Sequence, residues 1–507
     1  MSVHYSSRFL LLCLLALFFV CLGAPRPAGA TSAATGGSVS TAGSATATTG
    51  IPILRVALDE GVASASFSVA QGSYTLTDGA TGVSLGTPAP GGAWTITAAG
   101  TAMQVQGPGR ALETPGAPSY GGPITLQAAS GGSGGNQPPL FCYNGIKYRG
   151  SLVIQILNNS LLVLNVLDVE SYLYGVVGEE MGGGAPPEAY CAQAVASRSY
   201  ALSMRGLSPW YDVGCDTGAQ VYGGYTGEQE FAGSGDNPVV DAVQRTGGQV
   251  LEYDGALVKA YFNANAGGYT EDAENVWGII SEPYLKGVQS NGDAYAQNSW
   301  GASSYAWTKT CDRSDLGAQL GVGEIQDIQV SRNRTQVITD PATGTKTAQF
   351  IPGTTTVSGR VTQVTVVGAN STETYDRDDI RQALGLQSTL FDVDVGGQLE
   401  ALDAQGQTDA LSGDEVCVQG QTGPQQTVSL GSGSLYIMGP GNRLVTQNTS
   451  SNEIVFSGYG DGHGVGMSQW GAIGMAVNGD KYQTILELYY DQGKNDGNLQ
   501  IVGNYGS

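Results

Sequence analysis

One segment that is long enough for a helix and free of helix breakers stands among many short β-prone runs in this chain. Pro186 and Pro187 suit a helix start, and the segment EAYCAQAVASRSYALSM follows them. Small and apolar residues recur in it at helical spacing: Ala192, Val195, Ala196, Ser199 and Leu202. The pattern predicts one long helix whose small-residue face packs closely against a sheet.

Short strands and hairpins account for much of the remaining sequence. The runs ILRVAL, SASFSVA, SYTLTDG and AWTITAAG, separated by Gly, Asp and Pro turns, predict strands between Ile51 and about Gln127. Three hairpins are predicted further on: at 152–168 around Asn158-Asn159-Ser160, in QVLEYDGALVKAYFN with Asp254-Gly255 in the turn, and in GRVTQVTVVGANSTETYD.

Two shorter helices are predicted near the end of the chain, at about 467–477 and 482–490. Because helices and strands do not alternate as they do in βαβ units, a doubly wound parallel sheet is not expected. The sequence therefore predicts a β-rich α+β fold with one long central helix and a C-terminal helix pair. We expect one large, elaborated domain with β-rich insertions.

The first thirty residues have the pattern of a secretory signal peptide. Arg8 precedes the apolar run FLLLCLLALFFVCLG, and Ala28 and Ala30 supply the small residues of a cleavage site. The alternative is an uncleaved membrane anchor, but the run is shorter than the ~20 residues that a spanning helix needs. We expect 1–30 to be removed and 31–50 to form a low-complexity linker. The mature protein would then be secreted to the cell envelope (periplasm or cell wall), without a stable membrane span.

The net charge of the chain is strongly negative, −22 from 44 acidic and 22 basic residues. Negative charge repels phosphates and anionic lipids, so neither nucleic acid nor an anionic membrane surface is an expected partner. Charged residues are nevertheless sparse, and Tyr, Asn and Gln are abundant. This composition suits an uncharged, hydroxyl-rich ligand such as a glycan.

Five cysteines follow the predicted signal peptide: Cys142, Cys191, Cys215, Cys311 and Cys417. An odd number in an oxidising compartment leaves at least one thiol without a partner in the chain. The pairs 191–215 and 311–417 are candidates, and the sequence leaves the connectivity open. A structural zinc site is not expected, because the sequence lacks C-x-x-C spacing and has few histidines.

His463 lies in the glycine-rich stretch SGYGDGHGVGMSQWGAIGMAVNG, close to Ser468, and the pair suggests a serine hydrolase. A nucleophile elbow requires G-x-S-x-G, however, and Trp470 stands where the second glycine is needed. A single imidazole would also have to reach this serine across a tight turn. A better interpretation is a glycine-rich turn that feeds a helix, with Met467, Trp470 and Met475 packed inward. That interpretation leaves the imidazole unexplained.

Two adjacent carboxylates in YLYGVVGEEMGGGAPPEAY have two interpretations. Glu179 and Glu180 at the end of an apolar run would ordinarily be solvated. Burial against Val176, Val177 and Met181 would instead disfavour the charged form and raise the pKa of the carboxyl. A raised pKa is what a general acid needs near neutral pH.

A third segment, CDTGAQVYGGY, combines Asp216, Thr217, Gln220, Tyr222 and Tyr225 among glycines. Aromatic rings stack on pyranose rings and amides bond to their hydroxyls, so these residue types suit sugar binding. The same composition also makes an ordinary surface loop.

Four segments, in this order, resemble the sporulation stage II protein D (SpoIID) family and its amidase-enhancer (LytB) relatives. They are YLYGVVGEEM with PPEAYCAQAVASRSYAL, then CDTGAQVYGGY, then AYFNANAGGYTEDAENVWG with PYLKGV, and GHGVGMSQWGAIGMA. The resemblance covers roughly Leu140 to Tyr490. The organisation it implies is a loosely matching β-rich N-terminal region at 51–139, a SpoIID-like catalytic domain at 140–490 with β-rich insertions at about 291–360 and 395–440, and a C-terminal tail at 491–507.

The resemblance implies a peptidoglycan lytic transglycosylase. Such enzymes cut the bond between N-acetylmuramic acid and N-acetylglucosamine in glycan strands and leave 1,6-anhydro ends; the sporulation members act on strands stripped of stem peptides. The family's catalytic acid precedes the methionine of the GVV–EM segment, which is Glu180 here. One carboxyl suffices, because the muramic C6 hydroxyl replaces the water for which hydrolases use a second carboxylate.

Matching family positions imply further site residues, which would position the substrate, orient the acid or build the groove. They are His463, Ser468, Gln469, Arg198, Asp216, Gln220 and Tyr222. Some members bind zinc around the GG-T segment, where this chain has Ala266 and Tyr269, so neither a metal nor a cofactor is expected. Cys191 replaces a lysine usual in the family, and we interpret the change as a disulfide to Cys215.

Two functions without catalysis remain as alternatives. The amidase-enhancer relatives imply a cell-wall binding protein that stimulates a partner amidase, although the glutamate before Met181 favours catalysis. An envelope protein that anchors to glycan through the same groove is the other alternative.

Overall fold

The computed structural model describes residues 50–108, 119–129, 137–232, 236–396 and 452–503, together with the backbone of six short strands between 400 and 448. The predicted signal peptide, nearly all of the predicted linker and the side chain of Cys417 lie outside the described residues.

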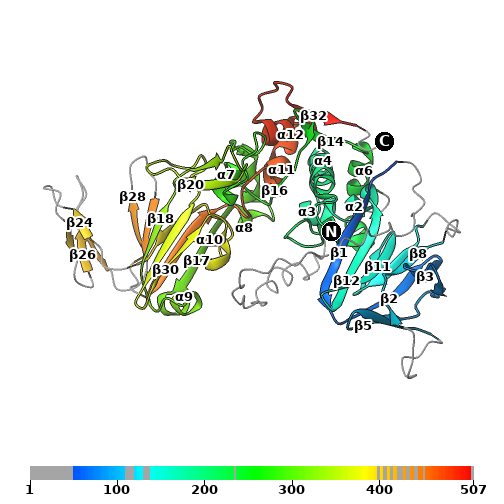
Figure 1. Ribbon diagram of the computed structural model, residues 1–507. Coiled ribbons are helices and arrows are strands. Elements are labelled where there is room, and N and C mark those ends of the chain that lie inside the picture. Colours follow the sequence, from blue (N-terminus) through cyan, green and yellow to red (C-terminus); the bar gives the residue numbers. More distant parts are fainter. Residues whose placement is uncertain are drawn as a thin grey trace, which may run out of the picture. The chain divides into compact units, whose positions relative to one another are not determined.

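Two sheets contain the strands of the first part of the chain (Figure 1). The first has the order β13 (Val213–Gly214), β1 (Ile53–Val62), β12 (Ser160–Asp168), β11 (Ser151–Leu157), β8 (Ile124–Ala128), β3 (Tyr74–Asp78), β4 (Ser84–Gly86). The second has the order β10 (Ile146–Tyr148), β9 (Leu140–Tyr143), β2 (Ser64–Gln71), β5 (Trp94–Ala99), β6 (Ala102–Gln106), β7 (Ser119–Tyr120). Apolar side chains from both sheets belong to one buried cluster.

Strands from both sides of residue 140 pair within these sheets. The antiparallel pairs are β1 with β12, β11 with β8, and β2 with β9. Strand β13 adds to the edge of β1 in parallel. The region predicted at 51–139 therefore shares both sheets with residues that follow it, and the predicted domain boundaries stay a prediction.

The predicted hairpins form, and the residues of their two-residue turns explain why. Asn158 and Asn159, between β11 and β12, have φ angles of 52° and 63°. Asp254 and Gly255, between β14 (Val250–Tyr253) and β15 (Ala256–Leu257), have φ angles of 50° and 77°. Asn, Asp and Gly tolerate positive φ, which matches the twist of a tight hairpin. The third hairpin joins β21 (Gln363–Gly368) and β22 (Thr372–Asp376).

Helix α4 (Pro187–Met204) begins at the predicted proline and has 18 residues. Every residue from Ala189 to Leu202 is buried, so the helix is enclosed on all sides and not on one face only. The elements that contact it include α6, α11, α12 and β14. The prediction of a single small-residue face against a sheet is thus too narrow, because helices cover most of its circumference.

The other helices are shorter. They are α2 (Val169–Tyr174), α3 (Val177–Met181), α5 (Gly224–Glu230), α6 (Pro238–Arg245), α7 (Ala273–Trp277), the 3₁₀ helix η1 (Asn291–Asn298), α8 (Ala302–Tyr305), α9 (Arg313–Leu320), α10 (Asp379–Leu384), α11 (Gln469–Val477) and α12 (Tyr482–Asp491). The last two match the predicted C-terminal helix pair. Among the described residues, no helix is both long enough and apolar enough to cross a membrane.

The remaining strands form smaller sheets. They are β14 with β15 and β32 (Leu499–Val502); β16 (Phe262–Asn263) with β31 (Met467–Ser468); β17 (Ala306–Asp312), β30 (Glu453–Tyr459) and β23 (Phe391–Asp394); β18 (Ile325–Ser331) with β21 and β22; β19 (Thr335–Thr339) with β20 (Lys346–Phe350); β24 (Glu400–Leu402) with β25 (Thr408–Ala410); β26 (Glu415–Val418) with β27 (Gln426–Ser429); and β28 (Ser434–Met438) with β29 (Leu444–Asn448). The β-rich α+β architecture predicted from the sequence is confirmed.

Candidate active site

The Glu180 carboxylate receives hydrogen bonds from two distant parts of the chain. Glu180 lies in the last turn of α3, and the backbone N–H of Val221 donates to its Oε1 at 2.7 Å. The side-chain amide of Gln469, the first residue of α11, donates to its Oε2 at 3.2 Å. Three of the four segments that carry the predicted site thus meet at one carboxyl.

The surroundings of Glu180 raise the pKa of its carboxyl from 4.5 to about 7. Burial is the largest cause, since it disfavours the charged form, and the negative charge of Glu179 adds to it. The hydrogen bonds from Val221 and Gln469 favour the ionised form and hold the pKa back. A carboxyl with a pKa near 7 is populated both with and without its proton at neutral pH, as a group that gives and then takes a proton must be.

Glu179 faces a different part of the fold. Its carboxylate lies against Gly223 and Gly227, where an added Cβ would overlap Oε1. Burial, followed by the charge of Glu230, raises its pKa. The two adjacent glutamates of α3 therefore do not share one pocket, and Glu179 is covered by α5 and the residue before it.

The loop before α5 is held by buried polar residues that aim the Val221 N–H at Glu180. Gln220 accepts a hydrogen bond from the Tyr172 hydroxyl at 3.0 Å and donates to the Ser197 carbonyl at 3.4 Å. The Tyr222 hydroxyl donates to Asn165 Oδ1 at 2.7 Å. Both side chains are buried, so the structure gives Gln220 and Tyr222 the task of supporting the loop.

Asp216 lies on the same loop but is exposed, and its Oδ1 accepts the N–H of Gly218 at 2.9 Å. It lines a cavity of about 480 Å³ together with Tyr200 and residues of β1. The pKa of Tyr200 is raised to about 12 by burial, by the neighbouring Tyr261 and by the charge of Glu180, in that order. Tyr200 was not predicted as a site residue, although it stands in the segment ASRSYAL of α4.

Ser468 caps α11. Its hydroxyl is fully buried, donates to Asp293 and accepts the N–H of Gly471 at 3.2 Å. It also accepts the N–H of Ala266 at 3.2 Å. Asp293 belongs to η1, so this helix helps to fix the start of α11 and with it Gln469.

His463 packs against aromatic rings. Its ring centroid lies 4.8 Å from that of Trp277 and 6.3 Å from that of Tyr261, and its Nδ1 accepts the N–H of Val465 at 3.0 Å. Burial is the main cause that lowers its pKa to about 4. The imidazole is therefore neutral at neutral pH. It packs beside Trp277 and accepts the N–H of Val465 within the glycine-rich turn, and its predicted role in positioning the substrate stays a prediction.

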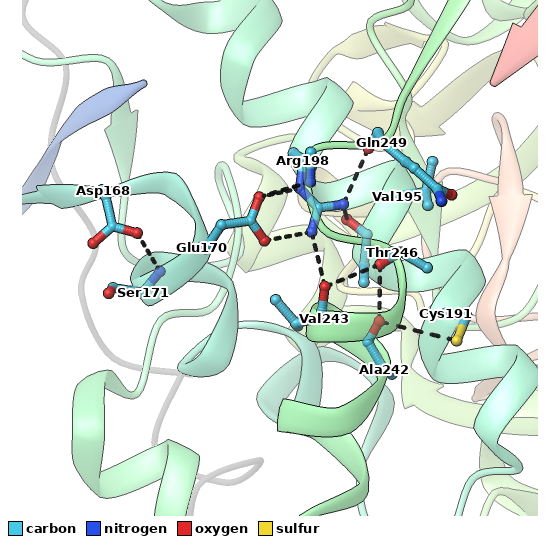
Figure 2. Close-up of polar contacts among 12 residues, drawn as sticks. Asp168, Glu170, Ser171, Cys191, Val195, Arg198, Ala242, Val243, Thr246 and Gln249 are labelled. Atoms are coloured by element: carbon cyan, nitrogen blue, oxygen red, sulfur yellow. Dashed lines mark hydrogen bonds and ion pairs between the residues drawn. The ribbon is translucent and has the colours of Figure 1, made fainter. Parts of the chain in front are cut away.

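Arg198 lies in the interior, where it joins three helices (Figure 2). Its Nε and Nη2 donate to the two carboxylate oxygens of Glu170 in α2, at 2.8 and 2.7 Å. It also donates to the carbonyls of Val243 in α6 and of Gln249, at 3.4 and 3.0 Å. The guanidinium of Arg198 is thus hydrogen-bonded within the fold, and its predicted part in building the groove stays a prediction.

The interpretation of a disulfide between Cys191 and Cys215 is wrong, since both are free thiols. Cys191 is buried in α4, with its Sγ 4.0 Å from the carbonyl of Ala242 in α6 (Figure 2). Cys215 follows β13, with its Sγ 3.6 Å from the carbonyl of Leu58 in β1. The thiols are directed at different elements because α4 turns Cys191 toward α6. Within the described side chains, no group of three or more His, Cys, Asp and Glu could hold a metal ion.

Comparison with known proteins shows which family this chain is similar to. The family model of the stage II sporulation protein SpoIID matches residues 157–253. An uncharacterized protein of Brachyspira hyodysenteriae is 30% identical over 355 residues, which cover 69% of this chain and 73% of that protein.

Two named proteins of Bacillus subtilis are also similar. The amidase enhancer is 29% identical over 329 residues, 63% of this chain but 39% of the enhancer. The stage II sporulation protein D is 26% identical over 336 residues, 64% of this chain and 73% of that protein. The chain belongs to the SpoIID family of stage II sporulation proteins.

Proposed function

We propose that this protein is an exported peptidoglycan lytic transglycosylase and that Glu180 is its acid and base. The observation that carries the proposal is the Glu180 carboxyl itself, with a pKa raised to about 7 by burial and two neutral hydrogen-bond donors on its oxygens. The names of the two Bacillus subtilis relatives, a sporulation protein and an amidase enhancer, support a role at the cell wall.

The chemistry needs one carboxyl that changes its protonation state twice. Protonated Glu180 gives its proton to the glycosidic oxygen as the bond from C1 of the muramic sugar breaks. The C6 hydroxyl of that sugar attacks C1, and the carboxylate accepts the C6 proton, which restores the acid. While the carboxylate is ionised, the N–H groups of Val221 and Gln469 stabilise its charge.

The surroundings of Glu179 support transglycosylation over hydrolysis. A hydrolase places a second carboxylate where it can activate water or attack C1. Glu179, the neighbouring carboxylate, is instead packed against Gly223 and Gly227. Activation by the substrate's own hydroxyl removes the need for that second group.

The test is mass spectrometry of the products after incubation of the mature protein with purified glycan strands, both denuded and peptide-bearing. Anhydro-muramic ends are expected from the native protein. Glu180→Gln should lower the rate by about 10²–10⁴, which is the typical contribution of a general acid. Glu179→Gln is the matched control and should retain most of the activity, because its carboxylate faces α5.

Other products would change the proposal. Reducing ends would mean hydrolysis and an additional carboxylate, and cleavage that survives Glu180→Gln would remove this residue from the mechanism. Absence of cleavage from both strand types would favour the second candidate, a non-catalytic protein that stimulates a cell-wall amidase, to which the similarity with the amidase enhancer points. A pull-down against wall amidases, with amidase activity measured with and without this protein, tests that candidate directly.

A further inference from the structure

Trp300 is a large apolar side chain left open to solvent, with 67% of its surface exposed. It stands between η1 and α8, within the segment predicted as an insertion at about 291–360. Trp buries a large apolar area and keeps a polar N–H, and it is enriched at interfaces for this reason. A single exposed indole is not evidence by itself, so what surrounds Trp300 decides its role.

The ring of Trp300 lies beside the end of the helix that carries Glu180. Gly182, two residues after the acid, has a φ of 69°, and a Cβ there would be 2.9 Å from Cη2 and Cζ2 of the indole. Glycine thus serves two needs at this position: it adopts a backbone conformation that disfavours side chains, and it lets the indole approach the backbone.

The indole is also held from the other side. Its ring centroid is 4.7 Å from that of Trp470, which is 5% exposed and directly follows Gln469, the donor to Glu180. Tyr295 is 46% exposed, and its ring centroid lies 6.4 Å from that of Trp470. Trp470 is therefore a buried support, and Trp300 and Tyr295 are the exposed rings next to it.

We propose that Trp300 is a sugar-stacking platform that holds an uncharged N-acetylhexosamine ring of the glycan strand next to the glycosidic bond at Glu180. The choice of a glycan rests on the proposed function, and the position rests on the continuity of Trp300 with Gly182, Trp470 and Gln469. An indole offers a flat apolar face to the C–H face of a pyranose. The insertion that carries it would thereby extend the site along the strand.

Binding is measured in the Glu180→Gln background, so that no strand is cut. Denuded glycan strands of defined length are titrated, with quenching of tryptophan fluorescence as one readout and calorimetry as the other. Trp300→Ala should weaken binding about tenfold or more, as truncation of a binding hot spot does, and Trp300→Phe should recover part of the loss. Trp210→Ala is the control: Trp210 is 44% exposed on a different turn and should bind as the parent does.

Each outcome has a defined meaning. Unchanged binding and unchanged fluorescence quenching in Trp300→Ala would overturn the proposal, and so would equal losses in Trp210→Ala and Trp300→Ala. If Trp300→Ala binds glycan as the parent does but no longer stimulates an amidase, the ligand of Trp300 is a protein partner and not a sugar. Melting curves of all variants check that they fold.

The stacking role of Trp300 and the transglycosylase activity can be tested separately. If the native protein makes no anhydro ends but Trp300→Ala still loses glycan binding, the result supports the stacking role of Trp300 and contradicts the transglycosylase activity. If Trp300→Ala forms anhydro ends at the same rate and with the same KM as the native protein, the result supports the transglycosylase activity and contradicts the stacking role of Trp300.

Discussion

At the scale of single residues, the two neighbouring glutamates of α3 lie in different surroundings. Glu180 has two hydrogen-bond donors and a pKa near 7, whereas Glu179 is packed under α5. Gln469 matters for the same reason: its amide touches the acid, while Ser468 beside it holds the helix start. Of these two adjacent polar residues, therefore, Gln469 contacts Glu180 and Ser468 holds the backbone at the start of α11.

The raised pKa of Glu180 predicts a stability difference that depends on pH. The carboxyl has a pKa of about 7 when folded and 4.5 when solvated, so the folded state binds more protons between these values. The free energy of unfolding therefore falls as the pH rises from 4.5 to 7, and this loss is absent below 4.5 and complete above 7. Glu180→Gln removes the titrating group.

We expect the Glu180→Gln variant to be more stable than the native protein at pH 8, by up to about 3 kcal/mol, and to gain no such advantage near pH 4. Urea unfolding at both pH values measures this. If the difference in the free energy of unfolding between the variant and the native protein is the same at both pH values, the raised pKa is contradicted. An effect that did not come from the titrating carboxyl would not depend on pH.

At the scale of elements, Arg198 connects α2, α4 and α6 from a fully buried position (Figure 2). Its pair with Glu170 has side-chain exposures of 1% and 18%, so loss of one partner leaves a charge with little access to water. We expect Arg198→Met to lower the free energy of unfolding by about 3 kcal/mol or more.

The pair of Arg245 with Glu188 provides the matched control for Arg198. The Arg245 side chain is 48% exposed, and Arg245→Met should cost less than about 1 kcal/mol. Denaturant titration of both variants distinguishes the roles. An Arg198→Met variant of native stability with a raised KM for glycan would instead support the groove position inferred from the sequence.

At the scale of the whole molecule, strands of the first part of the chain pair with strands of the part that carries Glu180. Strands β12, β11 and β9 pair with β1, β8 and β2. A fragment of residues 140–507 would leave these strands unpaired along one edge and uncover apolar side chains of the shared cluster. We expect it to lose its cooperative unfolding transition and its near-UV circular dichroism, whereas a fragment of 50–507 keeps both. A cooperative transition in the shorter fragment would show that 140–490 folds alone, as the predicted domain boundary implies.

Local features of the fold could be predicted from the sequence. Asn158-Asn159 and Asp254-Gly255 specify tight turns through the φ angles they tolerate, and Pro187 specifies the start of α4. Glu180 could be chosen as the acid only through its resemblance to a family motif. The residues alone favoured a solvated carboxylate.

From the sequence alone follow the long helix α4, the C-terminal helix pair, many of the strands and hairpins, and the position of Glu180 in a family motif. Which residues meet could be seen only in the folded chain: Glu180 and Gln469 are 289 positions apart in the sequence, yet their side chains are hydrogen-bonded. The same holds for the free thiols of Cys191 and Cys215 and for the indole of Trp300 beside Gly182. Turns and helix starts follow from preferences of a few adjacent residues, whereas a raised pKa or an exposed ring depends on burial, which is a property of the assembled fold.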